Sequence, residues 1–83
     1  MKHAREDYSR IQDPSGLIPE NEPVFLLRGQ DVLAPKLLEE WADRLELNGG
    51  SKEFADIVRQ HAKKMIEWQV NVKAELPDLK KKA

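Results

Sequence analysis

A glycine break divides this chain into two amphipathic segments, and it limits the possible folds more than any other feature. Asn48-Gly49-Gly50 is a strong helix stop, because glycine accepts the left-handed conformation that ends many helices. Apolar residues recur at helical spacing on both sides of the break. Because the connection is short, two helices joined by it must pack antiparallel. The sequence therefore predicts a helical hairpin.

Each expected helix has a start signal and a stop signal. Asp31 is a good N-cap for a first helix that runs to Leu47, and Pro35 falls in its first turn, where a missing N–H costs little. Ser51 is the expected cap of a second helix that runs to about Glu75, shortly before a proline. The second helix is therefore expected to extend past the start of the first.

The second helix carries two apolar stripes, about 100° apart around its axis. The main stripe consists of Phe54, Ile57, Val58, His61, Met65, Trp68 and Val72, and the other consists of Ala62, Ile66 and Val70. One neighbouring helix cannot cover both stripes, and a chain this small buries only about 60% of its unfolded surface. We therefore expect a homo-oligomer, most simply a dimer.

The segment before the hairpin is polar and contains turn signals. Residues 1–23 form an expected extended N-terminal arm, with a turn at Asp13–Gly16. Val24–Leu27 is the expected short strand, and it opens a domain of residues 24–76, which a basic tail of residues 77–83 follows. The predicted fold class is thus mainly α: an antiparallel helical hairpin with an N-terminal extended arm and one short strand.

Composition excludes several classes of protein. The 83 residues contain no cysteine, so no disulfide or thiolate metal site is expected. The net charge is −1 with acids and bases interspersed, which argues against nucleic-acid binding. The longest apolar run is the four residues VFLL, and the first ten residues lack the apolar part of a signal peptide. We expect a cytoplasmic protein that does not bind membranes.

The best candidate for a ligand site is the run Arg28-Gly29-Gln30-Asp31. Arginine offers a planar fork for phosphate or carboxylate, glycine lets a ligand approach the backbone, and a helix start supplies N–H groups and partial positive charge. An aromatic ring nearby could stack on a base. The expected ligand-binding residues are Arg28, Gln30, Asp31, Lys36, Trp68 and Tyr8. The structural alternative is that Asp31 is only a helix cap and that Arg28 pairs with it or with a glutamate.

Catalytic and metal chemistry have no positive signal. His61 falls on the apolar stripe of the second helix and is expected to be a core or boundary residue, and His3 has no second histidine at metal-ligand spacing. The serines lack the sequence context of a nucleophile. Trp41 is the expected core tryptophan, and Trp68 is expected at the boundary. We therefore expect no enzyme, no metal and no cofactor.

The motif I-P-x-x-E-P-V-F-L-L-R-G-Q-D, followed by A-P and by Trp41-Ala42, resembles a group of small proteins from phages and prophages. The resemblance covers roughly residues 9–68 and includes Arg10–Pro14. It implies a setting among compact accessory genes, some of which antagonise host defence or host transcription. Many such proteins act by stoichiometric binding, and the resemblance implies no particular activity.

Two hypotheses of function follow. The first is a non-enzymatic, oligomeric binding protein that sequesters a small anionic, nucleotide-like ligand, because the Arg28–Asp31 run joins a cation to a helix start. The second is a protein-interaction module that docks its hairpin or its strand onto a host protein and inhibits it, because the second helix is too apolar for one neighbour.

Overall fold

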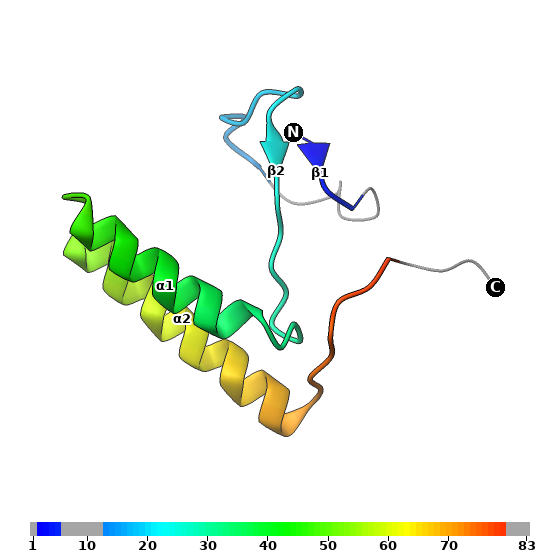
Figure 1. Cartoon of the computed structure of the whole chain (residues 1–83). Coiled ribbons are helices and arrows are strands. Elements are labelled where there is room, and N and C mark those ends of the chain that lie inside the picture. The colour runs from blue at the N-terminus through cyan, green and yellow to red at the C-terminus, as the bar shows by residue number, and fades with distance from the viewer. Residues whose placement is uncertain (1, 6–12, 80–83) are drawn as a thin grey trace. The chain divides into compact units, whose positions relative to one another are not determined.

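The structure, a computed structural model, describes residues 2–5 and 13–79 and has the expected mainly α fold built on a helical hairpin (Figure 1). The chain divides into two units. One contains the described residues up to Leu27 together with Leu79, and the other is Arg28–Asp78. The strands therefore belong to the first unit and the hairpin belongs to the second.

The first unit contains a two-stranded parallel sheet, in which β1 (Lys2–His3) pairs with β2 (Pro23–Val24). The sequence predicts a strand over Val24–Leu27, and the actual strand is shorter and begins one residue earlier. The reason is the length of its neighbour. Since β1 ends at His3 and a bend follows at residues 4–5, β1 offers residues 25–27 no further ladder partners.

The turn expected at Asp13–Gly16 is present in the same unit. The N–H of Gly16 donates to the carbonyl of Asp13 at 3.0 Å. The carboxylate of Asp13 also accepts from the N–H groups of Leu17 and Ile18, at 3.3 and 3.0 Å. Gly16 has a φ of 61°, a left-handed conformation that glycine adopts at no steric cost.

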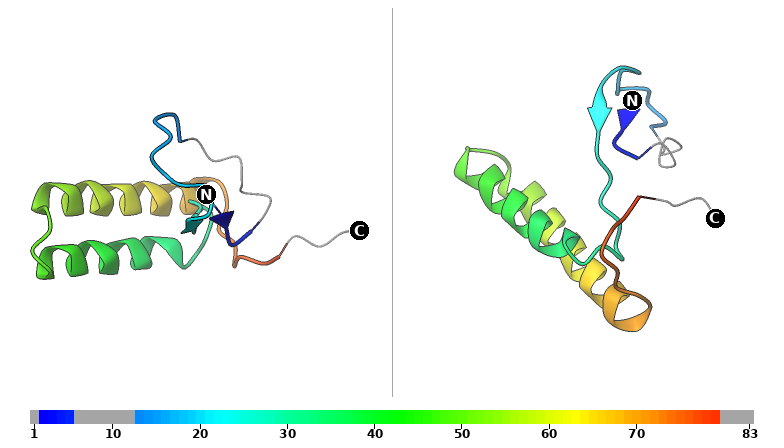
Figure 2. Two further views of the ribbon diagram at one scale, coloured as in Figure 1. Left: turned by 90° about the horizontal axis from the view of Figure 1, so that it is seen from above. Right: turned by 45° about the vertical axis from the view of Figure 1, so that its right-hand side comes forward.

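The hairpin consists of α1 (Ala34–Leu47) and α2 (Lys52–Asn71), which lie side by side in Figure 2. The glycine break ends α1 as expected: Gly49 has a φ of 83°, and its N–H donates to the carbonyl of Glu46. A Cβ on Gly50 would collide with Leu45, whose carbonyl oxygen would be 2.8 Å away. Ser51 caps α2 as expected, because its hydroxyl accepts from the N–H of Phe54 at 3.1 Å.

Two expected helix ends are wrong, and one long-range contact explains both. The sequence predicts α1 directly after Asp31 and α2 to about Glu75, but α1 begins at Ala34 and α2 ends at Asn71. Asp31 and Glu75 form an isolated parallel β-bridge. The N–H of Val32 donates to the carbonyl of Glu75 at 3.1 Å, and the N–H of Glu75 donates to Gln30 at 2.8 Å. Backbone in a bridge cannot also be helical, so each helix stops short of it.

The contact between the helices is made by small side chains. The buried apolar residues are Ala34, Ala42, Ala55, Ala62 and Met65, and no large side chain among the described residues is fully buried. Alanines let two helix backbones approach closely, and they leave no room between the helices for larger groups. Apart from the buried Met65, the large side chains are therefore displaced toward the flanks of the hairpin.

Trp41 and His61 show the consequence. Both are expected to lie in or near the core, yet Trp41 is 48% exposed and His61 is exposed. The ring of Trp41 meets Phe54 edge to face, with centroids 5.6 Å apart, outside the alanine contact. Trp68 is 51% exposed, in agreement with its expected place at the boundary.

An ion-pair cluster holds one flank of the hairpin together. Arg59 on α2 pairs with Glu46 at 2.6 Å and with Asp43 at 2.8 Å on α1, and it also pairs with Asp56 at 2.8 Å. The hydrogen bonds that Arg59 donates to Glu46 and Asp43 raise the pKa of its guanidinium. Hydrogen bonds from Lys52 and Arg59 lower the pKa of Asp56. The part of this flank around Arg59 is therefore polar and is not available for apolar packing.

We expect Ala62→Leu to destabilise the hairpin by about 1–3 kcal/mol, because the added methylenes have no space between the helices. Ala62 is 1% exposed on the inner side of α2. The matched control is Lys63→Leu, which adds the same side chain at the exposed neighbouring position. Urea unfolding followed by circular dichroism measures both. Equal unfolding midpoints for the two variants would show that the helices do not pack on Ala62.

Candidate functional site

The loop Arg28–Asp31 lies where α1 begins and α2 ends, and Gln69 of α2 fixes it. The side-chain amide of Gln69 donates to the carbonyl of Gly29 at 3.0 Å and to the carbonyl of Asp31 at 2.8 Å. Both hydrogens of one amide nitrogen are thus used on the loop. This contact ties the backbone of residues 29–31 to the last turns of α2.

Asp31 is a buried charge with a local structural role. It is 8% exposed, and its carboxylate accepts from the N–H of Leu33 at 2.8 Å. Its carbonyl accepts from the N–H of Ala34 at 3.0 Å. Leu33, and not Asp31, is the N-cap residue of α1, and its side chain makes no capping bond. Asp31 therefore stabilises the turn that leads into α1 and lies two residues before the N-cap, the position that the sequence predicts for it.

Glu75 brings a second carboxylate to the loop. Its side chain accepts from the amide of Gln30 at 3.2 Å and pairs with Lys73 at 3.4 Å. These groups are about half exposed, so the pair contributes little to stability. The loop is therefore surrounded by acidic as well as basic groups, and its charge is mixed.

The structure brings some of the expected site residues together. The indole of Trp68 lies against Gly29, since a Cβ built on this glycine would be 3.8 Å from the ring. Gln30 and Asp31 belong to the same loop, and Arg28 is exposed beside them. Lys36 is exposed in the first turn of α1. Tyr8, the remaining expected residue, lies outside the described residues.

The expected free N–H groups at this helix start are already used within the chain. The N–H of Asp31 donates to Arg28, that of Val32 to Glu75, and those of Leu33 and Ala34 to Asp31. The next residue is a proline, which has no N–H. The idea that residues 31–34 present unused donors to an anion is therefore wrong, because the β-bridge and the Asp31 turn take them first.

Sequence reasoning missed Gln69 and Glu75. Gln69 is a polar residue on the half-buried side of α2, next to Trp68, and a polar side chain in such a place needs a hydrogen-bond partner. That requirement is a signal that the sequence offers. Glu75 gives no such signal, because its role depends on its backbone and on a partner more than forty residues away.

A second surface, which we call the apolar face, is formed by large side chains of both helices. On the α1 side it consists of the N-cap residue Leu33 and of Leu37 and Trp41 within the helix. On α2 it consists of Phe54, Ile57 and Trp68. These six residues are between 45% and 59% exposed. The Trp41–Phe54 contact joins the two rows. The Arg59 cluster lies on the other flank, because helical spacing places Asp43 and Asp56 away from the apolar rows.

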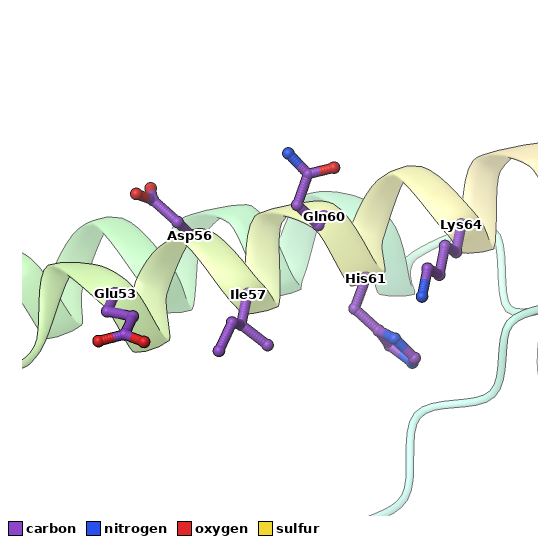
Figure 3. A pocket seen from close by; sticks show the side chains of 6 residues that line it. All are labelled: Glu53, Asp56, Ile57, Gln60, His61 and Lys64. Atoms are coloured by element: carbon purple, nitrogen blue, oxygen red, sulfur yellow. The ribbon is translucent and has the colours of Figure 1, made fainter.

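A shallow hollow of about 450 Å³ lies along the outer side of α2. Figure 3 shows Ile57, His61 and Lys64 pointing to one side of the helix, whereas Asp56 and Gln60 point to the other. One helix supplies all of its described lining residues, and the carboxylate of Asp56 is paired with Lys52 and Arg59. The hollow joins the apolar face at Ile57 and has no converging pair of catalytic groups.

Comparison with protein-family models, with curated proteins and with solved structures found no match to this chain. Within residues 2–5 and 13–79, no group of three or more His, Asp or Glu side chains is placed to hold a metal ion. No helix in the described part of the chain combines the length and the apolar character needed to cross a membrane. The two surfaces described above are therefore the basis for any functional argument.

We expect Gln69→Leu to lower the free energy of unfolding by about 1–3 kcal/mol, because two loop carbonyls lose their donor. Gln60→Leu makes the same exchange at an exposed position of α2 and should change stability little. Urea unfolding measures the loss, and amide hydrogen exchange at Val32 and Glu75 should accelerate only in the Gln69 variant. Unchanged exchange at these two amides would mean that Gln69 does not hold the loop.

Proposed function

We propose that this chain is a non-enzymatic, cytoplasmic protein-interaction module that acts by stoichiometric contact through the apolar face of its hairpin. The occupant of the face is a protein, because the surface is broad, apolar and built from side chains of two helices. The resemblance to small phage and prophage accessory proteins agrees with this mode of action. In that setting the module would bind and inhibit a host protein, or would assemble before doing so.

The observation that supports the proposal is the exposure of large apolar side chains on a single flank. Leu37, Trp41 and Ile57 are 45%, 48% and 59% exposed, and they are neighbours of other apolar residues rather than isolated ones. Single exposed apolar residues are ordinary, but contiguous patches of several hundred Å² mark interaction sites. Tryptophan is also enriched among the residues that dominate binding energy at interfaces.

The Arg28–Asp31 loop supports a second candidate, the binding of a small anionic, nucleotide-like ligand. One observation favours it: the indole of Trp68 lies against Gly29 with about half of its surface exposed, so a base could stack there beside Arg28. Against it stand the used N–H groups and the carboxylates of Asp31 and Glu75. We therefore place this candidate second.

A photo-crosslinking amino acid at position 37 tests the first candidate. Expressed in a bacterial cytoplasm and irradiated, the Leu37 variant should form a covalent adduct with a protein, because this side chain lies in the contact surface. The matched control replaces Glu39, which is exposed two residues further along α1. We expect no adduct from position 39. Absence of protein adducts from both positions would contradict the proposal.

A panel of mono-, di- and cyclic nucleotides separates the two candidates. Under the first candidate, no member raises the melting temperature of the wild-type protein. A ligand that binds only the folded state would raise it by mass action. A rise that Arg28→Ala removes and Arg44→Ala retains would instead establish the ligand site, since Arg44 is an exposed arginine near the other end of α1.

A further inference from the structure

We infer that the occupant of the apolar face is a second copy of this chain, so that two hairpins form a four-helix bundle with α1 packed over the α2 of the partner. The inference rests on the proposed function, because it names the partner of the same surface. It commits to a face-to-face dimer in which both hairpin loops point in the same direction.

One copy of the chain lacks a core of large apolar side chains. The buried apolar side chains of the described residues are four alanines and Met65, and none of the large ones is fully buried. Burial of large apolar groups is the main source of folding stability, and alanines supply little of it. A partner that is met only occasionally could not stabilise the free chain. A second copy is always present, so it can provide the missing burial.

The area of the apolar face fits an interface between two copies. At roughly half exposure, six large side chains leave on the order of 600 Å² on the apolar face. A standard interface uses roughly 800 Å² per partner, and the polar rim supplies the rest. The face therefore matches an interface with an equally sized copy of itself. It also lies at the upper end of the range for the largest exposed apolar patches on monomers, which are often functional.

The two long edges of the hairpin carry opposite net charges. At 100° per residue, Lys36, Glu40 and Arg44 follow the outer edge of α1, with one more positive than negative charge. Glu53, Lys64 and Glu67 follow the outer edge of α2, with one more negative than positive charge. Packing α1 over the partner's α2 brings edges of opposite net charge together twice, and packing α1 over α1 does not.

This arrangement sets the register of the contact. Within one hairpin, counting from the loop places Leu37 level with about Ala62, the neighbour of His61. Because the two-fold axis of the dimer is parallel to the helices, a residue lies at the same height along the bundle in both copies. Leu37 of one copy therefore lies near His61 of the other, and the two Leu37 side chains lie apart.

Light scattering of the full chain is the first test. We expect a particle of twice 9.6 kDa at tens of micromolar. Ile57→Lys, which places a charge on the apolar face, should give a monomer. Ile66→Lys makes the same exchange on the same helix toward the opposite flank, at 44% exposure, and should leave the dimer intact. A folded monomer for the wild type, or a dimer that persists in Ile57→Lys, would overturn the inference.

Cross-linking decides the case in which Ile57→Lys fails to fold. The chain has no cysteine, so Leu37→Cys and His61→Cys each introduce a single thiol. When the two variants are mixed, one of them carrying a mass tag, mild oxidation should yield the mixed disulfide. A disulfide formed mainly between two copies of the Leu37→Cys variant would reject the α1-over-α2 arrangement. No disulfide at all would reject the dimer.

These outcomes are distinguishable from failure of the proposed function. A folded monomer removes the second copy as occupant, while protein adducts from position 37 but not from position 39 still support the interaction module. A nucleotide-induced rise in melting temperature that depends on Arg28 contradicts the module, whatever the particle mass is.

Discussion

The close packing of α1 and α2 over alanine determines most of the molecule's surface. Because Ala42 and Ala62 let the helix backbones approach closely, most larger side chains, with the exception of Met65, are displaced toward the two flanks. One flank receives the apolar rows, and the other receives the ions around Arg59. The apolar face is therefore a direct consequence of a core made of small residues.

The second constraint acts at the open end of the hairpin. The bridge between Asp31 and Glu75 shortens both helices, and Gln69 holds the loop between residues 29 and 31. The bridge uses the N–H of Val32 and the Asp31 turn uses the N–H groups of Leu33 and Ala34, so these donors before the first turn of α1 are not available to an anion. The polar groups of a loop that is rich in ligand-binding residue types can thus be hydrogen-bonded within the chain. Only the donors that remain unused are then available to bind a ligand.

The hairpin could be predicted from the sequence because its signals are local. Asn48-Gly49-Gly50 and Ser51 act within one turn of their own position, and the structure has both caps where the sequence predicts them. The helix ends near Asp31 and Glu75 could not be predicted, since a single bridge between distant residues overrides local propensity. Helical periodicity also places Trp41 on the inner side of α1, but it cannot tell which residue of the apolar stripe packs between the two helices. The small side chain of Ala42 packs there, and the larger ring of Trp41 lies outside this contact.

The mixed outcome for the ligand residues follows from the same physics. Gln30, Asp31 and Trp68 are gathered because the antiparallel register alone places the start of α1 beside the end of α2. The register does not show which donors and acceptors of the loop are already hydrogen-bonded within the chain. In a dimer with both loops pointing one way, two copies of the Arg28–Asp31 loop would meet at the opposite end. Each copy brings the carboxylates of Asp31 and Glu75 as well as the guanidinium of Arg28 to that end, so a dimer doubles both signs of charge and leaves their ratio unchanged. The dimer therefore gives an anion site at this loop no electrostatic support, and the two hypotheses stand on separate observations.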